Sequence, residues 1–335
     1  MTEVLYLTAE EVADLAEMSD YVEASNDGFR QRGEGADADN PDKSANADDT
    51  TSLISYSAAL PDSGVMGGYM FSTGEGVDGW YITVLFDDED GTPLAVLDGG
   101  SWNPFKTGSA AGVATDYLAR DDIETVGVIG SGSQARAQVE AIDVVRDFDH
   151  IQVFSPTREH REDFAAEVAE TFDVEATAVD SSKAAVEGAD ILVSATKASG
   201  TVFEGEWLEA GTHVNAVGYE RIDAASIQRT TYVCDHEERA LDGHSSFTEL
   251  LSEGEVTEDD YDCELGDIVG GDAVGRTEDD EITLFSSSGT AVETIAGANM
   301  LYNRALDAGL GSTVDLTPAS EGFSMASFVK AYQRE

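Results

Sequence analysis

The chain has very little positive charge. It holds 18 Lys and Arg residues against 68 Asp and Glu among 335 residues, which gives a formal net charge of −50. Such a surface repels the phosphate backbone of nucleic acids and the anionic headgroups of lipids. We therefore expect no nucleic-acid partner and no membrane partner. Only five of the basic residues are lysines, so a lysine in a defined motif is more informative here than an acid.

Cysteine and long apolar runs are also scarce. Two cysteines, Cys234 and Cys263, make neither a disulfide framework nor a four-ligand zinc site, and we expect no metal. No apolar run approaches the roughly 18 residues that span a bilayer. The first residues lack a basic segment followed by an apolar one, as a secretory signal would have. These features predict a reduced, cytoplasmic setting.

Apolar residues are nevertheless present at 41%, so the chain is able to bury a sizeable core, and its length indicates about two domains. Short apolar runs with turn signals between them fill residues 53–98, which predicts a mainly antiparallel β region. Helical spacing and turn composition also predict helices at 8–30, 105–119 and 288–309, a loop at 33–51 and an irregular stretch at 252–281.

From residue 124 the pattern changes to alternating strands and helices. Alternation at this spacing indicates βαβ units and a parallel sheet, so the fold class is α/β with a Rossmann domain and an α+β domain. The predicted strands are 124–130, 151–155, 175–179, 190–196, 212–217 and 231–235, and the helices include 133–145 and 157–172.

A glycine motif follows the first of these strands. Residues 130–135 read GSGSQA, which fits G-x-G-x-x-[G/A] between a strand and a helix. Gly130 allows the tight turn, Gly132 lets the backbone approach a pyrophosphate, and Ala135 keeps helix and strand close. The helix that follows offers free N–H groups to phosphates. The motif predicts dinucleotide binding.

The end of the second parallel strand bears on the choice of dinucleotide. No acid stands there to bind the ribose hydroxyls of NAD, whereas Ser155, Thr157 and Arg158 suit a 2′-phosphate. We favour NADP(H) and leave NAD(H) possible. The predicted cofactor-binding residues are Gly130, Ser131, Gly132, Ser133, Gln134, Ala135, Ser155, Thr157, Arg158, Ser194, Ala195, Thr196, Val217, Gly218 and Thr107.

Motifs along nearly the whole chain resemble those of the ornithine cyclodeaminase/mu-crystallin family. They include Lys106-Thr107-x-x-Ala110, GSGSQA at 130–135, Gly211-x-His213-x-Asn215-Ala-Val-Gly218 and Ser287-x-Gly289-x-Ala291-Val-Glu293. The resemblance implies a substrate and dimerisation domain at 1–118 and 296–335, a Rossmann domain at 119–295, and a homodimer.

The resemblance also implies an NAD(P)-dependent enzyme that transfers a hydride at the α-carbon of a small amino or imino acid. Ornithine cyclodeaminase, ketimine or pyrroline-carboxylate reductase and alanine dehydrogenase chemistry all stay open. The alternative is a non-catalytic, NADP(H)-binding protein of the mu-crystallin kind, with a degenerate substrate site.

The chain departs from the family where the substrate carboxylate is held. The family's loop arginine falls at Lys43, or at Asn46 if the loop shifts, and its β-region lysine falls at Tyr69. The arginine of its R-T-x-A motif is Lys106, and the acid after the H-x-N-A-V-G strand is Glu220. The resemblance thus predicts Lys43, Tyr69 and Lys106 as substrate-binding residues, and Lys106, Glu220 and Tyr69 as catalytic ones.

The acidity leads to one prediction. We hypothesise that the chain comes from a cytoplasm at very high salt, because about 1 M salt shortens the Debye length to about 3 Å and screens the repulsion between acids. Urea unfolding followed by circular dichroism should therefore give a higher midpoint in molar potassium chloride than in dilute buffer. Equal midpoints in the two solutions would contradict the hypothesis.

Overall fold

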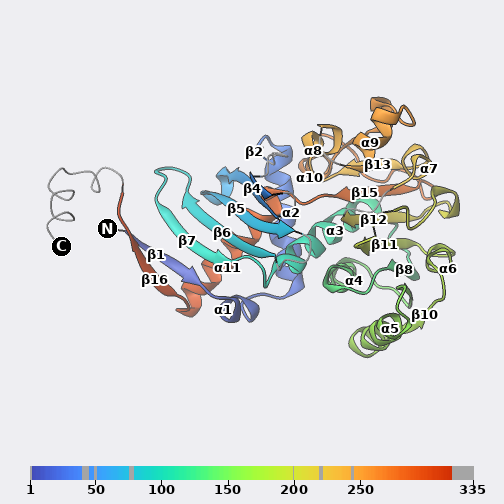
Figure 1. Ribbon diagram of the computed structural model, residues 1–335, viewed down its shortest axis with the longest axis horizontal. Helices are drawn as coiled ribbons and strands as arrows, with labels where there is room; N and C mark the ends of the chain where they lie inside the picture. The colour runs from blue at the N-terminus through green and yellow to red at the C-terminus, as the bar shows by residue number, and fades with distance from the viewer. Residues whose placement is uncertain are drawn as a thin grey trace, which may run out of the picture.

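The computed structural model describes residues 2–39, 45–48, 51–74, 79–198, 200–218, 222–242 and 245–318. These residues form two eight-stranded sheets, here called sheet A and sheet B, which lie side by side along the long axis (Figure 1). The described part contains no helix that is both long enough and apolar enough to cross a bilayer.

Sheet A contains strands β1 to β7 and β16, in the order β16-β1-β7-β6-β5-β4-β2, with β3 also paired to β4. All its pairs are antiparallel except β1 with β7, so the predicted antiparallel region is confirmed. The strands are β1 (Thr2–Leu7), β2 (Ala38–Asp39), β3 (Ala45–Asp48), β4 (Thr51–Leu60), β5 (Val65–Gly74), β6 (Trp80–Asp87), β7 (Pro93–Asp98) and β16 (Ser312–Leu316).

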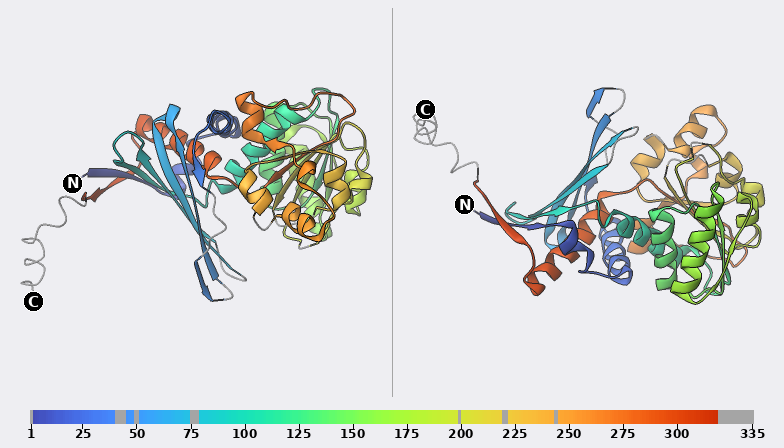
Figure 2. Two further views of the ribbon diagram at one scale, coloured as in Figure 1. Left: turned by 90° about the horizontal axis from the view of Figure 1, so that it is seen from above. Right: turned by 60° about the horizontal axis from the view of Figure 1, so that its bottom comes forward.

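Two long helices, α2 (Met18–Gly33) and α11 (Ala291–Ala308), pack together on one face of sheet A (Figure 2). They approach closely at Gly28, where a Cβ would lie 3.0 Å from the Ala296 Cβ. The predicted helix at 288–309 is confirmed, and it stops at Gly309 in the left-handed conformation.

Two local predictions around these helices were wrong, and two strands were missed. The single helix at 8–30 is instead α1 (Ala9–Ala13) and α2, because Glu17 and Asp20 form a capping box that begins a second helix. The predicted loop at 33–51 contains β2 and β3, which pair with β4. Strands β1 and β16 were not predicted.

Sheet B is entirely parallel in the order β10-β9-β8-β11-β12-β15-β13-β14, which confirms the predicted parallel sheet. Strand β15 was not predicted, and it separates β12 from β13. The strands are β8 (Thr125–Ile129), β9 (His150–Phe154), β10 (Glu175–Ala178), β11 (Ile191–Thr196), β12 (His213–Gly218), β13 (Thr231–Cys234), β14 (Cys263–Glu264) and β15 (Thr283–Ser287).

Helices cover both faces of sheet B, as a doubly wound fold requires. Apolar residues of α4 (Ser133–Val145) and α5 (Arg158–Phe172) share one core with β8, β9 and β11. A second core lies on the other face under α6 (Ser182–Val186), α7 (Ala224–Gln228), α8 (Glu237–Asp242) and α9 (Ser246–Glu253). The stretch 252–281 is more regular than predicted, since it holds β14 and α10 (Leu265–Gly270).

Helix α3 (Asn103–Leu118) joins the two halves and confirms the helix predicted at 105–119. It packs against α4 on one side and α2 on the other, and it also contacts β12 and β15. Its small residues make this possible: a Cβ on Gly108 would lie 2.6 Å from the Ala137 carbonyl oxygen of α4. The second turn of α3 is thereby fixed beside the start of α4. The division of the chain at residues 118/119 and 295/296 stays a prediction.

Candidate active site between the two sheets

The carboxyl ends of β8, β9, β11 and β12 meet at one edge of sheet B. After β8 the chain builds β9 and β10 on one side and then returns to build β11 and β12 on the other. Ligands of doubly wound folds bind at this switch point. Gly130 lies there with φ 128°, and a Cβ on it would sit 2.2 Å from the Ala195 carbonyl oxygen. Only glycine fits this turn.

The start of α4 suits a pyrophosphate. Gly132 caps the helix without a side-chain hydrogen bond, and nothing lies within 4 Å of a Cβ placed on it. The first N–H groups of α4 are therefore available to an anion. The Ser194 hydroxyl on β11 and the side-chain amide oxygen of Gln134 on α4 are buried nearby without a hydrogen-bond partner. Unpaired buried polar atoms are costly, so these residues fit a bound dinucleotide.

The other predicted cofactor residues gather at the same edge. Ser155 is buried at the end of β9 and accepts a hydrogen bond from the Ser131 hydroxyl at 3.1 Å. Thr157 caps α5, and Arg158 follows it, exposed and paired to Glu162. Val217 and Gly218 end β12 in register with Ala195 and Thr196, and Thr107 is buried on α3 next to Lys106.

A buried ion pair lies between the two sheets. The Lys106 ammonium on α3 donates to Glu293 Oε1 on α11 at 2.9 Å, with side-chain exposures of 4% and 0%. The second carboxylate oxygen of Glu293 is buried and makes no hydrogen bond. A Cβ on Gly289 would lie 4.0 Å from the Lys106 nitrogen, so the turn before α11 also borders this pair.

Tyr69 of β5 covers the ion pair. Its ring centroid lies 5.1 Å from the Lys106 nitrogen, and its hydroxyl donates to Asn103 Oδ1 at 2.9 Å. Burial raises the pKa of the Tyr69 phenol far above its usual value, which favours its neutral form. Phe71 and Tyr81 extend the aromatic surface, with centroids 5.4 Å and 5.7 Å from that of Tyr69.

Asp235 holds the turn that leads into α11. It follows β13, and its carboxylate accepts from Ser287 Oγ at 3.0 Å and from the backbone N–H groups of Ser288 and Gly289 at 2.8 and 2.6 Å. Burial raises the pKa of Glu293, and the charge of Asp235 adds to this, while the Lys106 ammonium acts in the opposite direction. We call Lys106, Glu293, Tyr69, Asn103 and Asp235 the inter-sheet site.

The inter-sheet site and the dinucleotide motif share one edge. Asp235 and Ser287 end parallel strands of sheet B, as Gly130 and Thr196 do. A cation, two acids and an aromatic wall thus lie at the edge where a dinucleotide would bind. This arrangement could hold a small anionic substrate beside the cofactor.

The structure changes the list of candidate residues. Lys106 and Tyr69, both predicted to bind the substrate, lie next to each other, while Lys43 and Glu220 lie outside the described residues. Asn46, the alternative to Lys43, stands on β3 opposite Ser52.

Two acids of the site were missed. Glu293 and Asp235 were hidden among 68 acids, although Glu293 closes the Ser287-x-Gly289-x-Ala291-Val-Glu293 motif. Its place three residues after the cap residue Thr290 was the available signal.

His213, a residue of the family motif, is a core residue. It is fully buried and hydrogen-bonded to Thr283 and Asn215, and burial lowers its pKa to about 3. No group of three or more His, Cys, Asp or Glu residues in the described ranges is placed to hold a metal ion.

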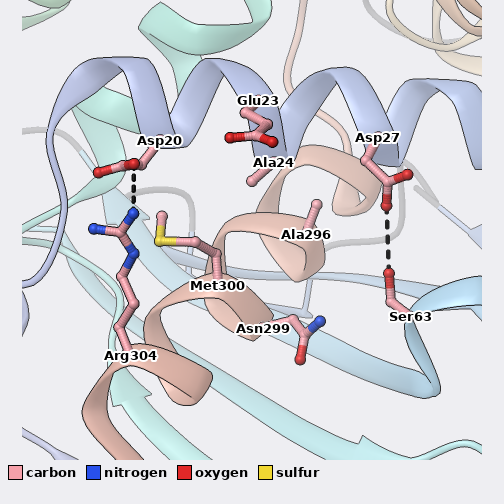
Figure 3. Close-up of a pocket in the computed structure, with 9 residues that line it drawn as sticks. All are labelled: Asp20, Glu23, Ala24, Asp27, Ser63, Ala296, Asn299, Met300 and Arg304. Atoms are coloured by element: carbon pink, nitrogen blue, oxygen red, sulfur yellow. Dashed lines mark hydrogen bonds and ion pairs between the residues drawn. The ribbon is translucent and has the colours of Figure 1, made fainter. Parts of the chain in front are cut away.

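A hollow lies between α2 and α11, with a volume of about 220 Å³ (Figure 3). Asp20, Glu23 and Asp27 of α2 line it, and the one basic side chain there, Arg304, is paired to Asp20. An acidic hollow repels an anionic cofactor or a carboxylate substrate. It is therefore a poorer candidate for the active site than the inter-sheet site.

Comparisons with known proteins agree with this geometry. The chain has the Rossmann architecture of NAD(P)-dependent oxidoreductases, and residues 2–309 match the model of the ornithine cyclodeaminase/mu-crystallin family. It belongs to that family. It is 38% identical over 240 residues to a delta(1)-pyrroline-2-carboxylate reductase of Bacillus cereus, across 70% of this chain and 74% of the relative.

Two solved structures are also similar. One is the Thermococcus litoralis delta(1)-pyrroline-2-carboxylate reductase in complex with NADH and L-proline, with a TM-score of 0.87 and 30% identity over 93% of this chain and all of that one. The other is an archaeal alanine dehydrogenase dimer with bound NAD, with a TM-score of 0.87 and 29% identity over 94% of this chain and all of that one. The family chemistry is NAD(P)-dependent oxidation and reduction of amino and imino acids.

The turn at Gly130 gives a testable prediction. Gly130→Ala should weaken NADPH binding by at least about tenfold, or about 1.4 kcal/mol, because the new Cβ displaces the Ala195 backbone. Fluorescence titration with NADPH measures the loss. Gly200→Ala is the matched control, since its Cβ meets nothing within 4 Å, and it should bind as the wild type does. Equal affinity of Gly130→Ala and wild type would refute this account of the turn.

Proposed function

We propose that this protein reduces a small cyclic imino acid, of the pyrroline-2-carboxylate kind, with NADPH. The observation that carries the proposal is the Lys106 ammonium held under an aromatic wall at the dinucleotide edge of sheet B. Lys106 would bind the substrate carboxylate, and the faces of Tyr69 and its neighbours would lie against the ring. When bound, the nicotinamide supplies the hydride.

The charges of the site favour a cyclic imine over a diamino acid. Ornithine carries a second ammonium, which needs an acid of its own when it is buried. Neither acid of the inter-sheet site has a negative charge to spare, because Lys106 balances Glu293 and Asp235 holds the turn at 287–289. The Bacillus cereus and Thermococcus litoralis relatives, both pyrroline-2-carboxylate reductases by name, support the same choice.

The preference for NADPH rests on the end of β9. Thr157 and Arg158 stand exposed at the start of α5, where they would meet a 2′-phosphate, and no acid stands directly after β9 to bind ribose hydroxyls. Relatives of known structure carry NADH and NAD, so a direct comparison of the two cofactors is needed.

Glu220 stays our candidate for the acid that serves the imine nitrogen, and Lys43 our candidate for a second cation.

The second candidate is a dinucleotide-binding protein without turnover. Tyr69 and Lys106 stand where the resemblance implies a lysine and an arginine, and lysine lacks the planar fork with which arginine holds a carboxylate. Tight NADPH binding without turnover of any imine or amino acid would favour this candidate.

We also infer a homodimer formed through the outer face of sheet A. Figure 2 shows the long helices on one face of this sheet only. The other face exposes Trp80, Ile82 and Met70 to 74%, 52% and 47%, and the register places Ile82 directly opposite Met70. Contiguous exposed apolar surface marks an interface, and the archaeal alanine dehydrogenase similar to this chain is a dimer.

The enzymatic proposal predicts oxidation of NADPH by pyrroline-2-carboxylate, faster than oxidation of NADH, in a spectrophotometric assay at molar salt. Lys106→Met should raise the KM for the imino acid by at least about tenfold, because a charge-assisted bond contributes about 1.5–3 kcal/mol. The double variant Lys106→Met/Glu293→Gln controls for a buried unpaired acid. No turnover with cyclic imines, ornithine, alanine or proline would contradict the enzymatic proposal.

The dimer proposal predicts that Trp80→Glu/Ile82→Glu is monomeric. Two buried carboxylates at the centre of an interface would each lack a partner and oppose association. Light scattering coupled to gel filtration in molar salt gives the mass. Val274→Glu, on an equally exposed apolar residue away from sheet A, should leave the mass of the wild type unchanged. A wild type that elutes as a monomer would disprove the dimer.

A further inference from the structure

The Lys106–Glu293 pair presents a problem for the binding of a carboxylate. The two side chains are buried together at 2.9 Å, so the pair as a whole is neutral while both are charged. A substrate carboxylate that approaches the Lys106 ammonium also approaches the Glu293 carboxylate. At such distances in a buried site, repulsion between two carboxylates offsets much of the attraction to one ammonium.

We propose that Glu293 is a positioning residue that holds the Lys106 ammonium in place and takes up a proton from solvent when a substrate carboxylate binds to Lys106. The inference rests on the proposed function. The inference adds to the proposed function a residue that the sequence did not single out, and a proton that enters the site together with the substrate.

The geometry of Glu293 supports this role. Only Oε1 bonds to Lys106, while Oε2 is fully buried and without a hydrogen-bond partner, so a proton has a place on the carboxyl group that breaks no existing bond. A buried carboxylate oxygen without a partner is costly when charged and much less so when protonated. Protonation would leave the pair with one positive charge, which an anionic substrate then neutralises.

The surrounding charges act in the same direction. Burial and the nearby Asp235 carboxylate, beyond the turn at 287–289, raise the pKa of Glu293, although Lys106 and the backbone N–H of Thr290 act to lower it. The Tyr69 phenol on β5 faces the pair with its ring and stays neutral, with Tyr81, Tyr56 and Asp98 behind it. Among these groups only Glu293 is a buried acid whose one oxygen is free.

The test is isothermal titration of the NADPH-loaded protein with proline, in two buffers of different ionisation enthalpy at the same pH. The wild type should take up a fraction of a proton for each proline bound, and that fraction should be lost in Glu293→Gln. Proline should bind more weakly to the wild type as the pH rises, because Glu293 is then charged before the ligand arrives. The affinity of Glu293→Gln should be flat over the same range.

A matched control distinguishes this role from general stabilisation. Glu264, also buried, pairs with Arg32 at 2.9 Å away from the site, so Glu264→Gln should lower stability and leave the proton uptake unchanged. Glu293→Asp keeps a carboxyl group and should restore part of the uptake. Uptake that persists in Glu293→Gln, or a wild type that binds proline without any uptake, would overturn the inference even if the variants fold poorly.

The same experiment separates this inference from the proposed function. A wild type that reduces an imine and binds proline without proton uptake defeats the role of Glu293 alone. A wild type that neither reduces an imine nor binds proline defeats the proposed function, and the inference with it.

Discussion

The contact between Lys106 and Glu293 is the interaction on which the rest of the site depends. Each partner comes from a helix that belongs to a different part of the chain, α3 and α11, and neither charge has access to water. A buried ammonium or carboxylate alone would lose more solvation than the fold is able to recover, so the two charges constrain each other. This requirement fixes α3 against α11 at the point where sheet A and sheet B meet.

The backbone around this pair is arranged to bring the two charges together. Gly108 lets α3 lie against Ala137 of α4, so the part of α3 that carries Lys106 is packed against the helix that follows the Gly130 turn. Asp235 ties the turn at 287–289 by four hydrogen bonds, which sets where α11 starts and therefore where Glu293 lies. The position of Lys106 thus depends on the Gly108 contact between α3 and α4, and the position of its partner Glu293 depends on Asp235.

Much of the fold could be predicted from the sequence because its signals are local. The alternating strands and helices after residue 124 and the GSGSQA turn gave the parallel sheet and its ligand edge. Apart from the capping box that begins α2, the features that were missed depend on non-local pairing. Strand β15 lies between β12 and β13 in the sheet, although about fifty residues separate β13 from β15 along the chain. Strands β1 and β16, from opposite ends of the described chain, pair with each other, and no local pattern marks such a partner.

Only part of the candidate site could be predicted from the sequence. Lysine is rare here, so Lys106 stood out, whereas Glu293 is one acid among 68 and its sequence context gives only a helix start. Its significance comes from burial, which a composition dominated by solvated acids conceals. Surface acids and the buried Glu293 are therefore subject to different physical constraints. Screening by salt makes a surface carboxylate inexpensive, while a carboxylate out of reach of water and salt has to be paired or protonated.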